Sequence, residues 1–238
     1  MTKPFLSASW INLLMANFHI DKKILEPYTP AFTEIDEWNG NCYVSLVGFL
    51  FKDTTVSGMR FPFHTTFEEV NLRFYVRYKE NDEWKRGVVF IKELVPRFMI
   101  TFIANTLYHE HYETRKMSHV FSITAKDLSV EYTWMIGQEL NYLRTSADLV
   151  KKSIDPGSEE EFITEHYWGY TRVTDQKTSA YEVQHPKWNI YPVRTFSFQC
   201  NVKELYGDRF VEPLATTPTS VFLADGSAIN VMNKQTIQ

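Results

Sequence analysis

The stretch FEEVNLRFYV, residues 67–76, carries the clearest secondary-structure pattern in the sequence. From Glu69 onward, polar and apolar side chains alternate with a period of two, which is the period of a β-strand. The apolar residues of such a strand share one face and the polar residues share the other. This stretch therefore predicts a strand with one apolar and one polar face.

The segments around this strand predict two more strands and a helix. Residues 42–51 form a nearly continuous apolar run, as expected for a strand that is buried on both faces. Residues 87–94 follow a polar turn and predict the returning strand of a hairpin. Residues 97–108 have apolar side chains at helical spacing, so we expect a helix there, with Phe98 and Phe102 in the core.

The rest of the chain predicts short strands separated by turns. Strand character recurs in five later segments: residues 118–123, 129–136, 141–144, 168–173 and 180–193. Asp21, Ser158 and Asn201 are the expected N-caps of short helices, and Asp225-Gly226 predicts a type I′ hairpin. Many strands with few helices predict a mainly β fold with a few helices (α+β), in which a curved antiparallel sheet closes on itself.

Length and composition narrow the class of protein. A chain of 238 residues with 44% hydrophobic and 23% charged residues is expected to form one domain, residues 1–238. The net charge of −4 argues against a nucleic-acid partner. Two distant cysteines and the lack of a long apolar segment lead us to expect a cytoplasmic protein without a membrane partner. The sequence has no phosphate loop, nucleotide fingerprint or nucleophile elbow, and we expect no cofactor.

The polar face of the strand at residues 67–76 is the strongest candidate site. Glu69, Asn71, Arg73 and Tyr75 occupy alternate positions, about 6.6 to 7 Å apart along the strand. Arginine clamps a carboxylate through two hydrogen bonds, and a buried glutamate with a raised pKa moves a proton. We therefore expect a ligand with an acid group, catalytic roles for Glu69 and Arg73, and substrate binding by Asn71 and Tyr75. The alternative is that this row is the solvated face of a half-buried strand.

A second group of titratable side chains follows the predicted helix. The group contains His109, His111 and Glu113. The His-x-His spacing of the two histidines is one that binds transition metals, but no third ligand stands at a suitable spacing. We therefore expect histidines at a cavity rim and no metal site. Tyr108 and Tyr112 fit a cavity mouth, because tyrosine offers a ring to the core and a hydroxyl to a ligand. Tyr108, His111 and Tyr112 are thus candidate substrate-binding residues.

Other charged residues near the strand and helix are expected at the surface. Lys92 and Glu93 end the segment at residues 87–94, and Arg97 opens the helical segment. Because charged side chains mostly face solvent, we assign these three no role in the site.

Six stretches carry a resemblance that covers nearly the whole chain. They are WINLLMANFHID (10–21), FEEVNLRFYV (67–76), GVVFIKELVPRFMITFIANTLYHEHYETRKM (87–117), EEFITEHYWGY (160–170), HPKWNIYPV (185–193) and PTSVFLADGS (218–227). Together and in this order they resemble an uncharacterised bacterial family of the acetoacetate decarboxylase-like superfamily. The resemblance implies a curved antiparallel sheet that closes into a cone-shaped barrel around a central cavity.

The resemblance also implies which catalytic residues of acetoacetate decarboxylase have a counterpart in this sequence. Acetoacetate decarboxylase forms a Schiff base on a lysine whose pKa is lowered by a second lysine and an apolar cavity. The matching stretch at residues 108–112 has no lysine in register, and Lys116, a few residues later, is included as a candidate binding residue. Glu69 matches the carboxylate of the central strand, whereas the second carboxylate and the arginine of the family fall near Val47 and Ile11. The resemblance therefore implies that the cavity of the superfamily is kept for another use, and that decarboxylation through a Schiff base is doubtful.

The sequence thus predicts a protein with a small-molecule cavity that acts on or binds a keto or hydroxy carboxylic acid. A non-catalytic metabolite-binding module is one alternative, because the same polar row recognises an acid without turning it over. A self-associating subunit, a homo-oligomer, is another, because 6 Trp and 18 Phe leave apolar area for a second copy.

Overall fold

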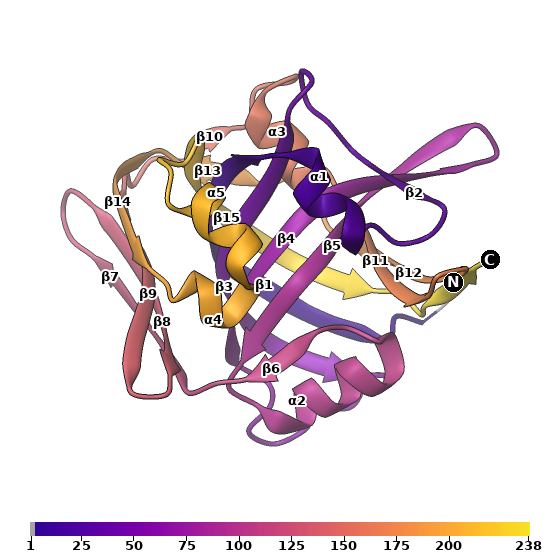
Figure 1. Ribbon diagram of the computed structural model, residues 1–238. Coiled ribbons are helices and arrows are strands. Elements are labelled where there is room, and N and C mark those ends of the chain that lie inside the picture. Colours follow the sequence, from indigo (N-terminus) through magenta and orange to yellow (C-terminus); the bar gives the residue numbers. More distant parts are fainter. Residues whose placement is uncertain (1–2) are drawn as a thin grey trace.

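The computed structural model describes residues 3–238 and is built mainly from strands (Figure 1). The strands are β1 (Leu6–Ile20), β2 (Thr33–Ile35), β3 (Cys42–Val56), β4 (Phe67–Glu80), β5 (Glu83–Val95), β6 (Tyr112–Thr114), β7 (Met117–Ile123), β8 (Leu128–Ile136), β9 (Glu139–Ala147), β10 (Lys152–Ser153), β11 (Trp168–Thr174), β12 (Lys177–Gln184), β13 (Asn189–Tyr191), β14 (Val193–Gln199), β15 (Ser220–Val231) and β16 (Gln235–Ile237). The helices are α1 (Lys22–Leu25), η1 (Glu26–Tyr28), α2 (Phe98–Ile103), η2 (Ala104–Tyr108), α3 (Glu159–Thr164), α4 (Val202–Tyr206), η3 (Asp208–Phe210) and α5 (Val211–Leu214). Within the described residues, no helix has the length and apolar character needed to cross a bilayer.

Seven strands form a ring in the order β15, β1, β3, β4, β5, β11 and β12. The ring closes where β12 pairs with β15, at Val183↔Val231 and Gln184↔Asn230. Neighbouring strands of the ring are antiparallel except β5 and β11, which are parallel. The predicted mainly β fold with a curved sheet that closes on itself is confirmed, and the sheet is mixed rather than wholly antiparallel.

A second sheet, in the order β14, β9, β8 and β7, packs against the outside of the ring (Figure 1). The two sheets approach closely at Gly48 of β3, where a Cβ would lie 2.8 Å from Cδ2 of Tyr132 on β8. The Tyr132 hydroxyl donates a hydrogen bond to the backbone oxygen of Asn12, at 2.9 Å. The outer hydrophobic core lies between these two layers.

Strand β4, which contains the stretch at residues 67–76, is buried on both faces. Alternate side chains join the outer core: Val70, Leu72, Phe74 and Val76. The intervening side chains turn into the ring and are between 1% and 8% exposed: Glu69, Asn71, Arg73 and Tyr75. The alternative of a solvated polar face is therefore wrong, because ring closure places both faces of β4 against protein.

Most predictions of local structure are confirmed. The expected N-caps Asp21, Ser158 and Asn201 each accept a hydrogen bond from a backbone N–H of the following turn. The segments at residues 42–51 and 87–94 lie within β3 and β5. The five later segments also form strands, the last of them divided among β12, β13 and the start of β14.

The predicted helix at residues 97–108 is present as α2 followed by the π-helical turn η2. However, Phe98 and Phe102 are 66% and 55% exposed, so the prediction that they lie in the core is wrong. The helix lies across one end of the ring (Figure 1), and there it is Ile100 and Ile103 that contribute to the interior.

The predicted hairpin at Asp225-Gly226 is also wrong, because β15 continues without a turn from Ser220 to Val231. Gly226 has a φ of +80° within this strand and lies opposite Ile11 of β1. A Cβ at Gly226 would lie 2.1 Å from the backbone oxygen of Trp10. Glycine is therefore required here because the strand is locally distorted and approaches β1 closely, and not because the chain turns.

Replacing Gly226 with alanine should destabilise the fold by more than about 2 kcal/mol, because it adds a steric clash to an unfavourable φ. Gly157→Ala is the matched control, because Gly157 has a φ of +78° but no atom within 4 Å of the added Cβ. The control should lose only about 1 kcal/mol. Urea unfolding of both variants measures the difference, and equal losses would contradict this account of Gly226.

Candidate functional site

The ring encloses a cavity of about 230 Å³. Aromatic side chains form much of its wall, among them Trp10, Phe49, Phe51, Phe67, Phe90 and Trp188. Polar side chains join them, among them Glu69, Asn71, Arg73, Glu93, Glu110 and His166. A few convergent polar groups in an otherwise apolar cavity are typical of a small-molecule site.

Five of the eight predicted site residues line this cavity: Glu69, Asn71, Arg73, Tyr108 and Tyr112. The alternation along β4 brings the first three together, and the segment after α2 brings the two tyrosines to them. Their roles in binding or catalysis stay predictions.

The other three predicted residues, Tyr75, His111 and Lys116, are not part of the cavity wall. The Tyr75 hydroxyl lies 2.6 Å from Oγ of Ser45, while His111 and Lys116 are exposed. No lysine is present among the lining residues in the described part of the chain. Within residues 3–238, no three His, Cys, Asp or Glu side chains are grouped so as to hold a metal ion.

Glu69 lies at the centre of a buried hydrogen-bond network. Its Oε1 accepts a hydrogen bond from Nδ2 of Asn71, and its Oε2 accepts one from the Tyr112 hydroxyl, both at 2.9 Å. Burial raises the pKa of Glu69 to about 7, although both hydrogen bonds and the positive charge of Arg73 oppose the shift. Near neutral pH this carboxyl group therefore exists in both protonation states.

Two further buried glutamates, Glu93 and Glu110, stand near Glu69. Oε1 of Glu110 accepts hydrogen bonds from Thr171 Oγ1 and the Tyr181 hydroxyl, both at 2.8 Å, and burial raises the pKa of Glu110 to about 7. Burial also raises the pKa of Glu93 well above its ordinary value, with repulsion from the other two glutamates adding to the shift. Oε2 of Glu93 and Oε2 of Glu110 have no hydrogen-bond partner within residues 3–238.

Glu93 is 1% exposed, so the prediction that it lies at the surface is wrong. A one-residue shift in the pairing of β4 with β5, between Leu72 and Arg73, places Glu93 opposite Asn71. Cross-strand partners point to the same face, so the shift turns Glu93 into the cavity and Lys92 outward.

A glycine allows the Glu110 network to form. A Cβ at Gly169 of β11 would lie 2.2 Å from Cζ of Tyr181, so only glycine leaves room for this ring. The ring in turn carries the hydroxyl that donates to Glu110. Neither Glu110 nor Tyr181 belongs to a periodic sequence pattern that marks it as a site residue.

The Arg73 guanidinium is a buried cation with a weak partner. Its Nη2 donates to Sδ of Met15 at 3.7 Å, and its Nε has no partner in the described residues. Arg73 forms no ion pair with a carboxylate within residues 3–238. A thioether is a weak acceptor, and the guanidinium also lies 5.9 Å from the centroid of the Tyr75 ring, but neither contact supplies a counter-charge. The arrangement therefore suits an anionic ligand.

Solved structures with a similar fold include "Enduracididine biosynthesis enzyme MppR complexed with pyruvate", at a TM-score of 0.71 and 11% identity. This match covers 100% of the chain and 92% of that structure. An acetoacetate decarboxylase from Legionella pneumophila matches with a TM-score of 0.66 and 11% identity, over 100% of the chain and 88% of that structure. At such low identity the likeness shows the fold alone, which is acetoacetate decarboxylase-like as predicted.

Sequence comparison shows the family. The uncharacterized protein YqjF of Bacillus subtilis (strain 168) is 29% identical over 105 residues, which is 44% of this chain and 42% of that protein. The match therefore spans less than half the length of this relative. A family model described as an uncharacterized conserved protein matches residues 7–228. The chain belongs to this family, DUF2071, which confirms the predicted membership of an uncharacterised family with an acetoacetate decarboxylase-like fold.

Proposed function

We propose that this protein binds a small oxo carboxylic acid in its cavity and catalyses proton transfer within it. The observation that carries the proposal is the buried Arg73 guanidinium, which has no ion-pair partner among the described residues. A ligand carboxylate provides the counter-charge through two parallel hydrogen bonds. Arg73 is therefore the anchor of the acid group.

Two solved structures with a similar fold support an oxo acid as the ligand. The MppR structure is a complex with pyruvate, and acetoacetate decarboxylase is named after acetoacetate. Both pyruvate and acetoacetate are oxo acids. In this chain the cavity wall has no lysine within the described residues, so the proposed reaction does not pass through a Schiff base.

Two of the three buried glutamates, Glu69 and Glu93, provide the base and the acid. The ionised form of Glu69 takes a proton from the carbon next to the substrate carbonyl, and the electrons of that C–H bond form a carbon–carbon double bond. Protonated Glu93 gives its proton to the carbonyl oxygen, so the oxo acid becomes its enol. General acid–base catalysis is most effective when the pKa of the catalytic group lies near the working pH, as it does for Glu69.

The aromatic wall favours an acid with an apolar side chain. A three-carbon acid leaves much of a cavity of about 230 Å³ unfilled, whereas an aromatic side chain packs against rings such as Phe49 and Trp188. Phenylpyruvate should therefore bind more tightly than pyruvate.

Arg73→Met should remove acid binding while keeping the fold, because methionine fills the space without a buried charge. In a thermal-shift titration, phenylpyruvate should raise the Tm of the wild type, and its Kd should rise about 30-fold or more in Arg73→Met. Arg144→Met is the control, because Arg144 lies on β9 of the outer sheet, outside the cavity, where its Nε donates to Oγ of Ser197. Unchanged affinity in Arg73→Met would refute the assignment of the anchor.

Glu69→Gln should strongly slow proton transfer but retain binding. In D₂O, the wild type should speed the exchange of the hydrogens next to the carbonyl of phenylpyruvate, as followed by NMR. The rate should fall by about 100-fold or more in Glu69→Gln, which cannot take a proton. Binding without any exchange in the wild type would instead identify a metabolite-binding module.

The raised pKa of Glu110 predicts a pH-dependent stability. Between its ordinary value of 4.5 and its folded value of about 7, the folded state binds more protons than the unfolded state. The stability that comes from the protonated carboxyl is therefore complete below pH 4.5 and is lost as the pH rises through about 7. Glutamine does not titrate, so Glu110→Gln should gain stability relative to the wild type by on the order of 2 kcal/mol between about pH 5 and pH 8.

Urea unfolding at several pH values measures this difference. The control variant Glu83→Gln changes an exposed glutamate outside the cavity and should show no such trend. A constant difference between Glu110→Gln and the wild type across the pH range would contradict the assignment of a protonated Glu110.

A further inference from the structure

The cavity is closed at the end that lies beyond Arg73 along β4. His166 forms part of the wall there, and its ring packs against the rings of Tyr75 and Phe162, with centroid distances of 4.7 and 5.0 Å. Its Nε2 lies 3.1 Å from Oδ2 of Asp36. The side chains of His166 and Asp36 are only 1% and 5% exposed, so packed and paired groups seal this end.

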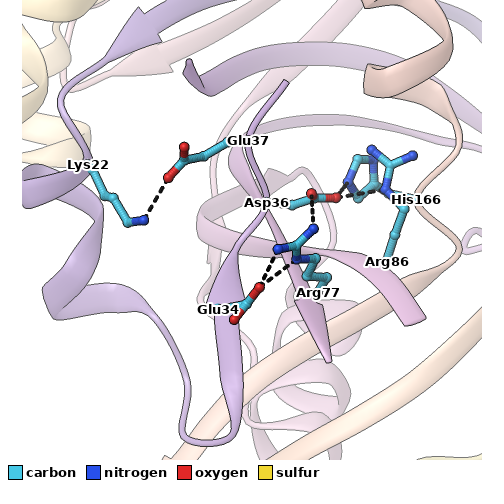
Figure 2. Close-up of polar contacts among 7 residues, drawn as sticks. All are labelled: Lys22, Glu34, Asp36, Glu37, Arg77, Arg86 and His166. Carbon is cyan, nitrogen blue, oxygen red and sulfur yellow. Dashed lines mark hydrogen bonds and ion pairs between the residues drawn. The ribbon is translucent and has the colours of Figure 1, made fainter. Parts of the chain in front are cut away.

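Two arginines hold Asp36 in place behind His166, as Figure 2 shows. Nε of Arg86 donates to Oδ2 of Asp36 at 2.7 Å, and Nη1 of Arg77 lies 3.8 Å from its Oδ1. The backbone N–H of Asp36 donates to the backbone oxygen of Tyr75 at 2.9 Å, which ties the cluster to β4. Burial raises the pKa of Asp36, but the hydrogen bonds from His166 and Arg86 outweigh burial and keep the carboxylate ionised.

The cavity opens at the opposite end of β4. Among the lining residues in the described part of the chain, Phe61 and Met99 are the two that are exposed, at 45% and 49%. Phe61 belongs to the loop at residues 57–66, which joins β3 to β4, and Met99 belongs to α2. These two side chains therefore mark the mouth of the cavity, which lies between this loop and α2.

The direction of β4 determines how an acid held by Arg73 lies in the cavity. Phe67 is the first residue after the loop at the mouth, and Arg73 follows six residues later on the same face of the strand. At about 3.4 Å per residue, Arg73 is roughly 20 Å from Phe67 along the strand. Because the end beyond Arg73 is sealed, the rest of the ligand points along β4 towards the mouth.

The path from the interior to the surface is apolar at the mouth. Ile100 and Ile103 of α2 line the cavity, whereas Phe98 and Phe102 of the same helix are exposed, with ring centroids 6.4 Å apart. On the facing loop, Phe63 is 84% exposed. Grouped apolar side chains on a protein surface are typical of a binding surface. The apolar surface thus continues from inside the cavity past its mouth.

We infer that the substrate is a long-chain oxo acid, with its carboxylate on Arg73 and an unbranched alkyl chain that leaves the cavity between Phe61 and Met99. The inference deepens the proposed function and rests on it, because it names the group that fills the cavity between the anchor and the mouth. A short acid leaves the apolar path near the mouth in contact with water. Each CH₂ group that covers this path strengthens binding.

A chain-length series tests this inference. Calorimetric titration compares 2-oxobutyrate, 2-oxooctanoate and 2-oxododecanoate, each below the concentration at which it forms micelles. In the wild type the Kd should fall with chain length, and 2-oxododecanoate should bind at least about 10-fold more tightly than 2-oxooctanoate. Equal affinities for these two acids would overturn the inference.

Phe61→Asn and Met99→Asn test the position of the chain. Both side chains are exposed, so both variants should fold like the wild type. Each should weaken the binding of 2-oxododecanoate by about 3-fold or more relative to its effect on 2-oxobutyrate, because apolar contact is lost only at the mouth. Phe32→Asn is the matched control, because Phe32 is 54% exposed outside the cavity and asparagine tolerates its φ of +66°.

Two methionines report which end of the ligand lies where. Sδ of Met15 accepts from Nη2 of Arg73 at 3.7 Å, and Met99 stands at the mouth. In protein labelled with ¹³C at the methionine methyl groups, 2-oxobutyrate should shift the NMR signal of Met15 but not that of Met99. The acid 2-oxododecanoate should shift both signals, which Met15→Leu and Met99→Leu assign.

The outcomes separate the inference from the proposed function. If all three acids shift Met15 and none shifts Met99, the inference fails while the proposed function stands. If 2-oxododecanoate shifts Met99 but not Met15, its carboxylate is not held by Arg73, and the inference fails together with the assigned anchor. If none of the acids binds, the proposed function fails and the inference falls with it.

Discussion

The closure of the ring by β12 and β15 is the contact on which the rest of the structure depends. The pairing at Val183↔Val231 and Gln184↔Asn230 turns a curved sheet into an enclosure with a lining of aromatic rings. Charged groups inside such an enclosure lose their hydration, which disfavours their ionised forms. The raised pKa values of the three cavity glutamates are thus consequences of closure, and so is the need of the Arg73 guanidinium for an anion.

The strand with the polar row could be predicted from the sequence because a period of two is a local property of the chain. Alternation puts Glu69, Asn71 and Arg73 on one face, whatever surrounds the strand. Whether that face is solvated or buried depends on strands far away in the sequence, so the alternation alone does not decide between the two. The resemblance to the acetoacetate decarboxylase-like superfamily provided that missing context.

The remaining residues of the cavity depend on irregular features that no periodic pattern reveals. If the hairpin continued in simple register from Glu80↔Glu83, Glu93 would pair with Val70 and point outward. The one-residue shift in the ladder reverses this orientation. Glu110 lies in the irregular segment between η2 and β6, and His166 follows the end of α3, so their positions come from tertiary packing rather than from spacing along the chain.

The pairing of β1 with β15 joins segments that are about 200 residues apart in the sequence. During translation at about 5 to 20 residues per second, β1 leaves the ribosome tens of seconds before its partner does. Strand β3 can cover one edge of β1 early, but the other edge, together with the acidic interior, stays open until β15 arrives. An unpaired strand edge is a template for pairing with other chains, so the late synthesis of β15 leaves β1 with an aggregation-prone edge for as long as its partner is absent.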